Sequence, residues 1–174
     1  MELLARIPKD RIAVLIGKGG RTRKMLEKSS GATLEIDSAT GDVSAIWDQE
    51  ELDPIVKMKM PDVIRAIGRG LAPNRAVKLL DDDVFLRMYD IREWVGRQPN
   101  QTRRMRSRLI GRNGRIRSLI EEMSRTEMAI YGSTVLVIGD EDGLALATPA
   151  IENILNGSEH GTVLHGLEQD RKRM

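Results

Sequence analysis

The chain has 174 residues, with 28 Lys and Arg against 26 Asp and Glu for a formal net charge of +2, and it contains no cysteine. The lack of cysteine excludes a disulfide framework, a thiolate metal site and a cysteine nucleophile. The apolar content of 40% and charged content of 31% are typical of a globular protein. Because no apolar run reaches the ~18 residues of a membrane span, we expect a cytoplasmic protein that has no membrane partner.

The first part of the chain predicts six elements in the order β-α-α-β-β-α. They are a strand over 2–7, helices over 11–16 and 21–30, strands over 32–37 and 42–47, and a long helix from 54 to about 71. The last helix has an Asp53-Pro54 start, with proline in its first turn. An apolar stripe runs along it from Ile55 and Met58 to Ile67, and Pro61 is expected to kink or restart it.

The second part repeats this order. Pro73 marks a boundary, and residues 73–83 are expected to form a linker that includes a short helix. The predicted elements then are a strand over 84–89, a basic helix ending at 110, a helix over 115–123, strands over 127–131 and 134–138, and a helix over 144–155. An insertion is expected at 91–100. We predict one domain over 1–72, a second over 84–157, and a C-terminal tail over 158–174 that is helical.

One short phrase occurs in both halves. Residues 15–21 read Leu-Ile-Gly-Lys-Gly-Gly-Arg, and residues 109–115 read Leu-Ile-Gly-Arg-Asn-Gly-Arg. The first glycines, Gly17 and Gly111, are 94 positions apart, and apolar positions after them match at the same offset. Glycine has no Cβ, so a glycine turn with a basic centre can approach a sugar-phosphate backbone closely. The repeat predicts a nucleic-acid-binding protein built from two related domains.

The order β-α-α-β-β-α, with Gly-x-x-Gly between the first two helices, resembles the type I KH domain. The resemblance covers roughly residues 1–157 and implies an α+β fold of two tandem KH domains, each a three-stranded antiparallel sheet packed on three helices. In that family the Gly-x-x-Gly loop clamps the backbone of about four nucleotides of single-stranded nucleic acid. Each copy therefore predicts one clamp.

The linker and the second copy, especially residues 111–123 and 129–135, resemble the archaeal two-KH protein related to the Partner of Nob family. This resemblance implies assembly of the small ribosomal subunit, binding near the 3′ end of the small-subunit rRNA, and joint action with the Nob endonuclease. It implies an RNA-binding protein without catalytic residues, metal or cofactor.

The candidate RNA-binding residues belong to the two turns and to an arginine-rich helix. Residues 97–117 hold eight arginines and no acid, which indicates a basic face on a nearly neutral protein. Since Met105 and Leu109 are expected to face the core, Arg104 and Arg108 are expected to point outward. The predicted RNA contacts are Gly17, Lys18, Gly19, Gly20, Arg21, Arg104, Arg108, Gly111, Arg112, Asn113, Gly114 and Arg115.

Apolar residues are assigned to two further roles. Ile16 and Ile110 are expected to be core residues that anchor each turn from below. Base contacts are expected from the strand beside the groove, at Leu34 and Ile36 in the first copy and at Met128 and Ile130 in the second. With only five aromatic residues, stacking on aromatic rings is not expected to be the main base contact.

Other interpretations of the sequence remain open. Gly17 and Gly19, with Asp37 twenty residues after Gly17, would suit a dinucleotide-binding turn if residues 11–16 formed a strand. The glycines would also suit a tight turn without a ligand, and the arginines a solvated face or a protein partner. The alternatives to an RNA-binding factor are thus a KH-fold scaffold for an RNA-processing complex and a nucleotide-dependent enzyme.

Overall fold

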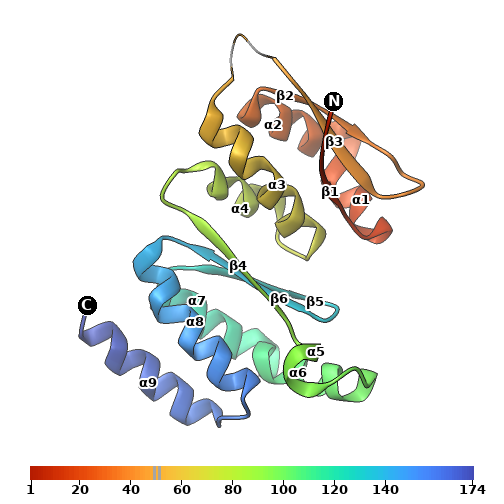
Figure 1. The fold of residues 1–174 in the computed structure, drawn as a ribbon. Coiled ribbons are helices and arrows are strands. Elements are labelled where there is room, and N and C mark those ends of the chain that lie inside the picture. Colours follow the sequence, from red (N-terminus) through yellow and green to blue (C-terminus); the bar gives the residue numbers. More distant parts are fainter. Residues whose placement is uncertain (49, 51) are drawn as a thin grey trace. The chain divides into compact units, whose positions relative to one another are not determined.

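The structure is a computed structural model that describes residues 1–48, 50 and 52–174. It divides into two compact units, unit 1 over Met1–Val84 and unit 2 over Phe85–Met174. Each unit has one three-stranded antiparallel sheet with helices packed on it (Figure 1). The β-α-α-β-β-α order occurs in both units, which confirms the predicted α+β architecture.

Unit 1 has its long third strand in the middle of the sheet. The strands β1 (Glu2–Arg6), β2 (Ala32–Ile36) and β3 (Asp42–Trp47) lie in the order β1-β3-β2. The helices are α1 (Ile12–Ile16), α2 (Arg21–Ser30), α3 (Pro54–Gly68) and α4 (Pro73–Ala76). The Arg6 guanidinium donates two hydrogen bonds to Asp42, which ties β1 to β3 and lowers the pKa of the Asp42 carboxyl.

Helix α3 begins as predicted, runs through Pro61 and ends at Gly68, slightly before the predicted end at about 71. The Asp53 carboxylate accepts a hydrogen bond from the Ile55 N–H at 2.9 Å and so caps the helix. The helix does not restart at Pro61, which lies inside one continuous segment. The buried apolar stripe of α3 is shorter than expected, because Ile55 and Met58 at its start are 41% and 70% exposed.

Residues 73–83, expected to be a linker, are packed within unit 1. The short helix α4 and the 3-10 turn Val77–Leu80 both contact α3, and Leu79 is buried. The buried Lys59 ammonium donates to the carbonyl oxygen of Val84 at 2.5 Å and to that of Asp81. A buried ammonium needs such acceptors, so this segment packs as part of unit 1.

Unit 2 repeats the sheet and adds helices. Strands β4 (Phe85–Asp90), β5 (Glu127–Tyr131) and β6 (Thr134–Gly139) lie in the order β4-β6-β5. The helices are α5 (Arg92–Val95), α6 (Pro99–Ile110), α7 (Arg115–Ser124), α8 (Glu141–Leu155) and α9 (His160–Lys172). The expected insertion forms α5 and the start of α6. There Trp94 packs edge-on against Tyr89, whose hydroxyl pKa is raised by burial to about 12.

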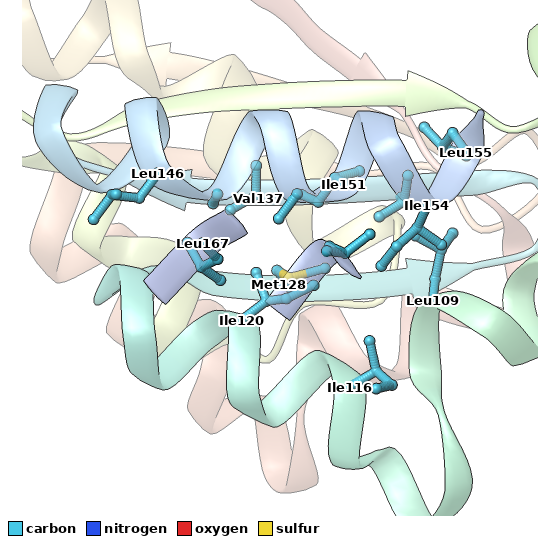
Figure 2. Packing of buried hydrophobic residues seen from close by; sticks show 14 of the residues in the cluster. Leu109, Ile116, Ile120, Met128, Val137, Leu146, Ile151, Ile154, Leu155 and Leu167 are labelled. Carbon is cyan, nitrogen blue, oxygen red and sulfur yellow. The ribbon is translucent and has the colours of Figure 1, made fainter. Parts of the chain in front are cut away.

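The core of unit 2 combines one face of the sheet with four helices (Figure 2). Leu109 of α6 and Ile120 of α7 are fully buried with Met128 of β5. Helix α9 contributes the buried Val163 and Leu167 and contacts α7 and α8. The C-terminal segment is therefore a helix that belongs to the core of unit 2.

Candidate nucleic-acid interface at the glycine turns

The two repeated phrases form glycine turn 1 (residues 17–20) and glycine turn 2 (residues 111–114), each between two helices. The first glycine has nearly the same conformation in both, with φ 75° and ψ 172° at Gly17 and φ 75° and ψ 174° at Gly111. A Cβ on Gly17 would lie 2.2 Å from Thr22 Oγ1, and one on Gly111 would lie 2.4 Å from Ile116 Cγ1. These glycines are required by the close packing of each turn on the helix that follows it.

The later positions of the turns also have matching backbones. Residue three is left-handed in both, with φ 60° at Gly19 and φ 55° at Asn113, and asparagine is among the few residues that adopt this conformation readily. Residue four follows at φ 76° in Gly20 and 75° in Gly114. A Cβ on Gly19 or Gly20 would meet no atom within 4 Å. The outer side of turn 1 is therefore open to a ligand.

Basic side chains border both turns. Lys18 and Arg112 occupy the second turn position, while Arg21 and Arg115 begin α2 and α7, and all four are exposed. Neither α2 nor α7 has an acidic residue in its first turn. Since a helix N-terminus presents N–H groups and a positive dipole end, this arrangement favours phosphate groups.

Arg104 and Arg108 do not share the environment predicted for them. Arg104 is exposed, as expected of an RNA contact. The Arg108 guanidinium instead donates to the carbonyl oxygens of Ile154 (3.0 Å) and Ser158, near the end of α8. His160 Nε2 of α9 lies 2.8 Å from the Arg108 carbonyl oxygen. Because the last carbonyls of a helix lack intrahelical partners, Arg108 fastens α6 to α8 and is not a free outward cation.

The prediction that Ile16 and Ile110 are core residues is wrong. The fully buried residues at these places are Leu15 and Leu109, while both isoleucines are only half-buried. In α6 the inward direction is set by Met105 and Leu109, and Ile110 lies about 100° farther round the helix. The isoleucines therefore lie at the rim of the core, beside the turns.

Two of the four expected base contacts are inaccessible. Leu34 and Met128 are 0% and 1% exposed and face the helices, while Ile36 and Ile130 are half-buried. Strands β2 and β5 are edge strands, and the side of each that faces the helices contributes to the core. Of the four, only Ile36 and Ile130 retain accessible surface for a base.

An ionic pair that the sequence analysis did not identify supports each edge strand. Glu27 Oε2 accepts from the Leu34 N–H at 2.8 Å, and Arg23 donates to the Leu34 carbonyl oxygen. Glu121 Oε2 accepts from the Met128 N–H at 2.9 Å. The pairs Arg23–Glu27 and Arg117–Glu121 have N–O distances of 3.9 and 3.6 Å. The signal was present in the sequence, since Arg-x-x-x-Glu recurs at the same offset of 94.

The competing sites receive no support. Residues 11–16 form helix α1 rather than a strand, so glycine turn 1 lacks the strand that a dinucleotide-binding turn follows. Within the described residues no group of three or more His, Cys, Asp or Glu side chains is arranged to hold a metal ion. The described helices include none that is long and apolar enough to cross a membrane.

Comparison with known proteins gives the family. Residues 85–172 match the eukaryotic-type KH domain (KH-domain type I) of the second domain of PNO1, and residues 3–52 match the KH domain family. The chain is 37% identical over 171 residues to a KH domain-containing protein of Methanocaldococcus jannaschii, covering 98% of this chain and 74% of that protein. It is 30% identical over 118 residues to the pre-rRNA-processing protein pno1 of Aspergillus fumigatus, covering 67% of this chain and 47% of that protein.

A solved structure extends the likeness to the fold. A chain of the crystal structure of the a/eIF2alpha-aDim2p-rRNA complex from Pyrococcus horikoshii superposes with a TM-score of 0.90 at 42% identity, covering 98% of this chain and 93% of that one. The chain spans about half the length of the fungal relative and most of the archaeal ones. By these matches the chain belongs to the Pno1 family of proteins with two KH domains.

Proposed function

We propose that this protein binds single-stranded RNA through both glycine turns and acts in the assembly of the small ribosomal subunit. The observation that carries the proposal is the duplicated turn, with the same backbone in two units and with exposed cations beside it. Phosphate contacts of this kind supply affinity without base recognition. Lys18, Arg21, Arg104, Arg112 and Arg115 are the proposed phosphate contacts.

The proposed RNA is the 3′ region of the small-subunit rRNA. Relatives support a ribosomal role, since one is named for pre-rRNA processing and one is part of a complex with rRNA. The proposed protein partner is the Nob endonuclease, with the KH protein holding the RNA rather than cutting it.

The test measures binding of the full chain to a labelled fragment from the rRNA 3′ end, with a shuffled strand of equal length as control. We expect tight, salt-dependent binding. In K18D/G19D and R112D/N113D, carboxylates replace the phosphate-binding groups of turn 1 and turn 2, so each double variant should bind more weakly, and their combination should abolish binding. Circular dichroism checks that the fold survives.

The second candidate function is a scaffold for an RNA-processing complex. It is favoured by the internal use of Arg108, which removes one cation from the proposed RNA surface. A scaffold would show no salt-dependent RNA binding, and its association with the Nob endonuclease would be unchanged in both double variants. Weakened RNA binding in the double variants excludes this alternative.

A further inference from the structure

A second basic surface of unit 2 lies on helix α6, which leads into glycine turn 2. Met105 and Leu109 of this helix are buried, so the step of about 100° per residue turns the opposite side of α6 outward. The outward residues, which we call the outer α6 face, are Asn100, Arg103, Arg104 and Ser107, and all four are exposed. Arg103 Nη1 donates to Asn100 Oδ1 at 3.3 Å, and the Ser107 hydroxyl donates to the Arg103 carbonyl oxygen at 3.1 Å. The face is thus a continuous strip of polar groups.

The chemistry of the outer α6 face suits a polyanion rather than a protein. Two of its side chains are guanidinium groups, and residues 97–117 contain no acid that could neutralise them. The centre of a protein interface is depleted of charge and is built around apolar or aromatic anchors. None of the residues of this face is apolar, whereas guanidinium, amide and hydroxyl groups are common donors to the phosphates of nucleic acids.

The same composition favours a double strand over a single strand. Proteins hold single strands largely through stacking or apolar contacts with unpaired bases, for which the outer α6 face has no side chain. An RNA duplex hides its bases and presents phosphates and 2′-hydroxyl groups beside a wide, shallow minor groove. Arg103 and Arg104 can donate to the phosphates, while the side-chain oxygens of Asn100 and Ser107 can accept from 2′-hydroxyl groups.

The place of this face in the chain connects it to the proposed RNA site. Helix α6 ends at Ile110, and glycine turn 2 follows at Gly111. We propose that the outer α6 face binds the backbone of an RNA stem that adjoins the single strand held at glycine turn 2. The inference rests on the proposed RNA binding and adds the class of RNA, which is a junction between a duplex and a single strand.

Unit 1 has the same turn but lacks this face. Its helix before turn 1, α1, has five residues, compared with twelve in α6. At the offset of 94 the counterparts of Arg103, Arg104 and Ser107 are Lys9, Asp10 and Ala13. An acid beside the lysine repels a phosphate, and Ala13 has no hydrogen-bonding side chain. The stem is therefore assigned to unit 2 alone.

The test compares binding of the full chain to three kinds of RNA. They are a single strand of about nine nucleotides, a hairpin with a stem of about ten base pairs, and the two joined at the 3′ or the 5′ end of the hairpin. With one of these polarities we expect the joined RNA to bind about tenfold tighter than the single strand. Each phosphate of a double helix contributes about −0.9 to the slope of log affinity against log salt concentration, so the slope should steepen by about 1–2.

The variant N100A/R103Q removes one amide and one cation from the outer α6 face and leaves the proposed phosphate contacts of the single strand in place. It should reduce the gain from the stem to about threefold or less, while binding of the single strand is retained. Arg103→Lys keeps the cation and should keep most of the gain. Lys9→Gln is the matched control, because it removes the cation at the equivalent position of unit 1, and it should leave the gain unchanged.

Changes to the stem show which of its groups are bound. Shuffling the stem sequence while base pairing is kept should leave the gain unchanged, because backbone contacts carry no base information. Equal affinity for the joined RNA and the single strand would overturn the inference, as would a gain that survives N100A/R103Q or depends on the stem sequence. Absence of binding to both the single strand and the joined RNA would instead overturn the proposed RNA binding.

Discussion

Units 1 and 2 share one turn but support it differently. Turn 1 is followed by a helix whose exposed face is basic, with Arg21, Lys24 and Lys28. The corresponding residues after turn 2 are Arg115, Ser118 and Glu122, of which only Arg115 is a cation, and two further exposed cations lie before the turn, at Arg103 and Arg104 on α6. The backbone of the turn is therefore conserved within the chain while the charge around it is redistributed.

The second difference is the helix behind the turn. In unit 2, Arg108 and His160 connect the end of α6 to α8 and α9, close to turn 2. The counterpart of Arg108 in unit 1 is Val14, which cannot donate such bonds. The comparison teaches that one turn geometry is compatible with two kinds of support, so the units should respond differently to equivalent substitutions.

The largest expected effect concerns the leucines beneath the turns. Leu15→Ala and Leu109→Ala should each destabilise the unit concerned by about 2–5 kcal/mol, because both side chains are fully buried. Ile16→Ala and Ile110→Ala, at the rim, should cost about 1 kcal/mol or less. Urea unfolding of the four variants measures this ranking. Equal losses for leucines and isoleucines would show that the turns are packed otherwise.

The next effect separates Arg108 from Arg104. Arg108→Ala removes the hydrogen bonds from the guanidinium to the Ile154 and Ser158 carbonyl oxygens and should lower the free energy of unfolding by about 1–3 kcal/mol. Arg104→Ala, at an exposed position, should change it by less than about 0.5 kcal/mol. Thermal and urea unfolding compare the two. If the Arg108→Ala variant were stable and its RNA binding depended less on salt, Arg108 would be an RNA contact after all.

Salt dependence tests the redistribution of charge. Each phosphate neutralised on a single strand contributes about −0.7 to the slope of log affinity against log salt concentration. Changing Arg104, Arg112 and Arg115 together to Gln should therefore flatten the slope by up to ~2. The matched triple change in unit 1, at Arg21, Lys24 and Lys28, should flatten it to a similar extent if its strand follows α2. The change of slope in each triple variant reports how many phosphates the substituted residues of that unit contact.

The smallest effect is expected from exchanging the residues at the third position of the turns. Gly19→Asn and Asn113→Gly should each change stability and RNA affinity by only a few tenths of a kcal/mol, since both residues adopt the left-handed conformation. Gly19→Val is the control and should cost about 1–2 kcal/mol, because a β-branched residue resists that conformation. A large loss of RNA affinity in Gly19→Asn would mean that the RNA lies directly against the Cα atom of Gly19, on the open side of turn 1.

The sequence by itself determined the order of elements, the two-unit organisation and the place of both turns. These depend on local signals, such as the alternation at residues 32–36 and the three glycines at positions 17, 19 and 20, which act within a few residues. Because the sequence repeats at an offset of 94, each of these signals occurs twice. The recurrence of Arg-x-x-x-Glu is equally visible in the sequence, but only the structure shows that each glutamate accepts a hydrogen bond from an edge strand.

The tertiary structure alone decided which flank of each helix is covered. Arg108 and Arg104 have the same spacing and charge, yet Arg108 is held by carbonyls of residues 46 and 50 positions away. The sequence of residues 73–83 predicts a polar linker, whereas in the structure this segment packs on α3 and the carbonyl group that follows it accepts a hydrogen bond from Lys59. Helical periodicity predicts that a face is apolar, but the edge of that face is set by contacts between segments far apart in the sequence, which no local pattern encodes.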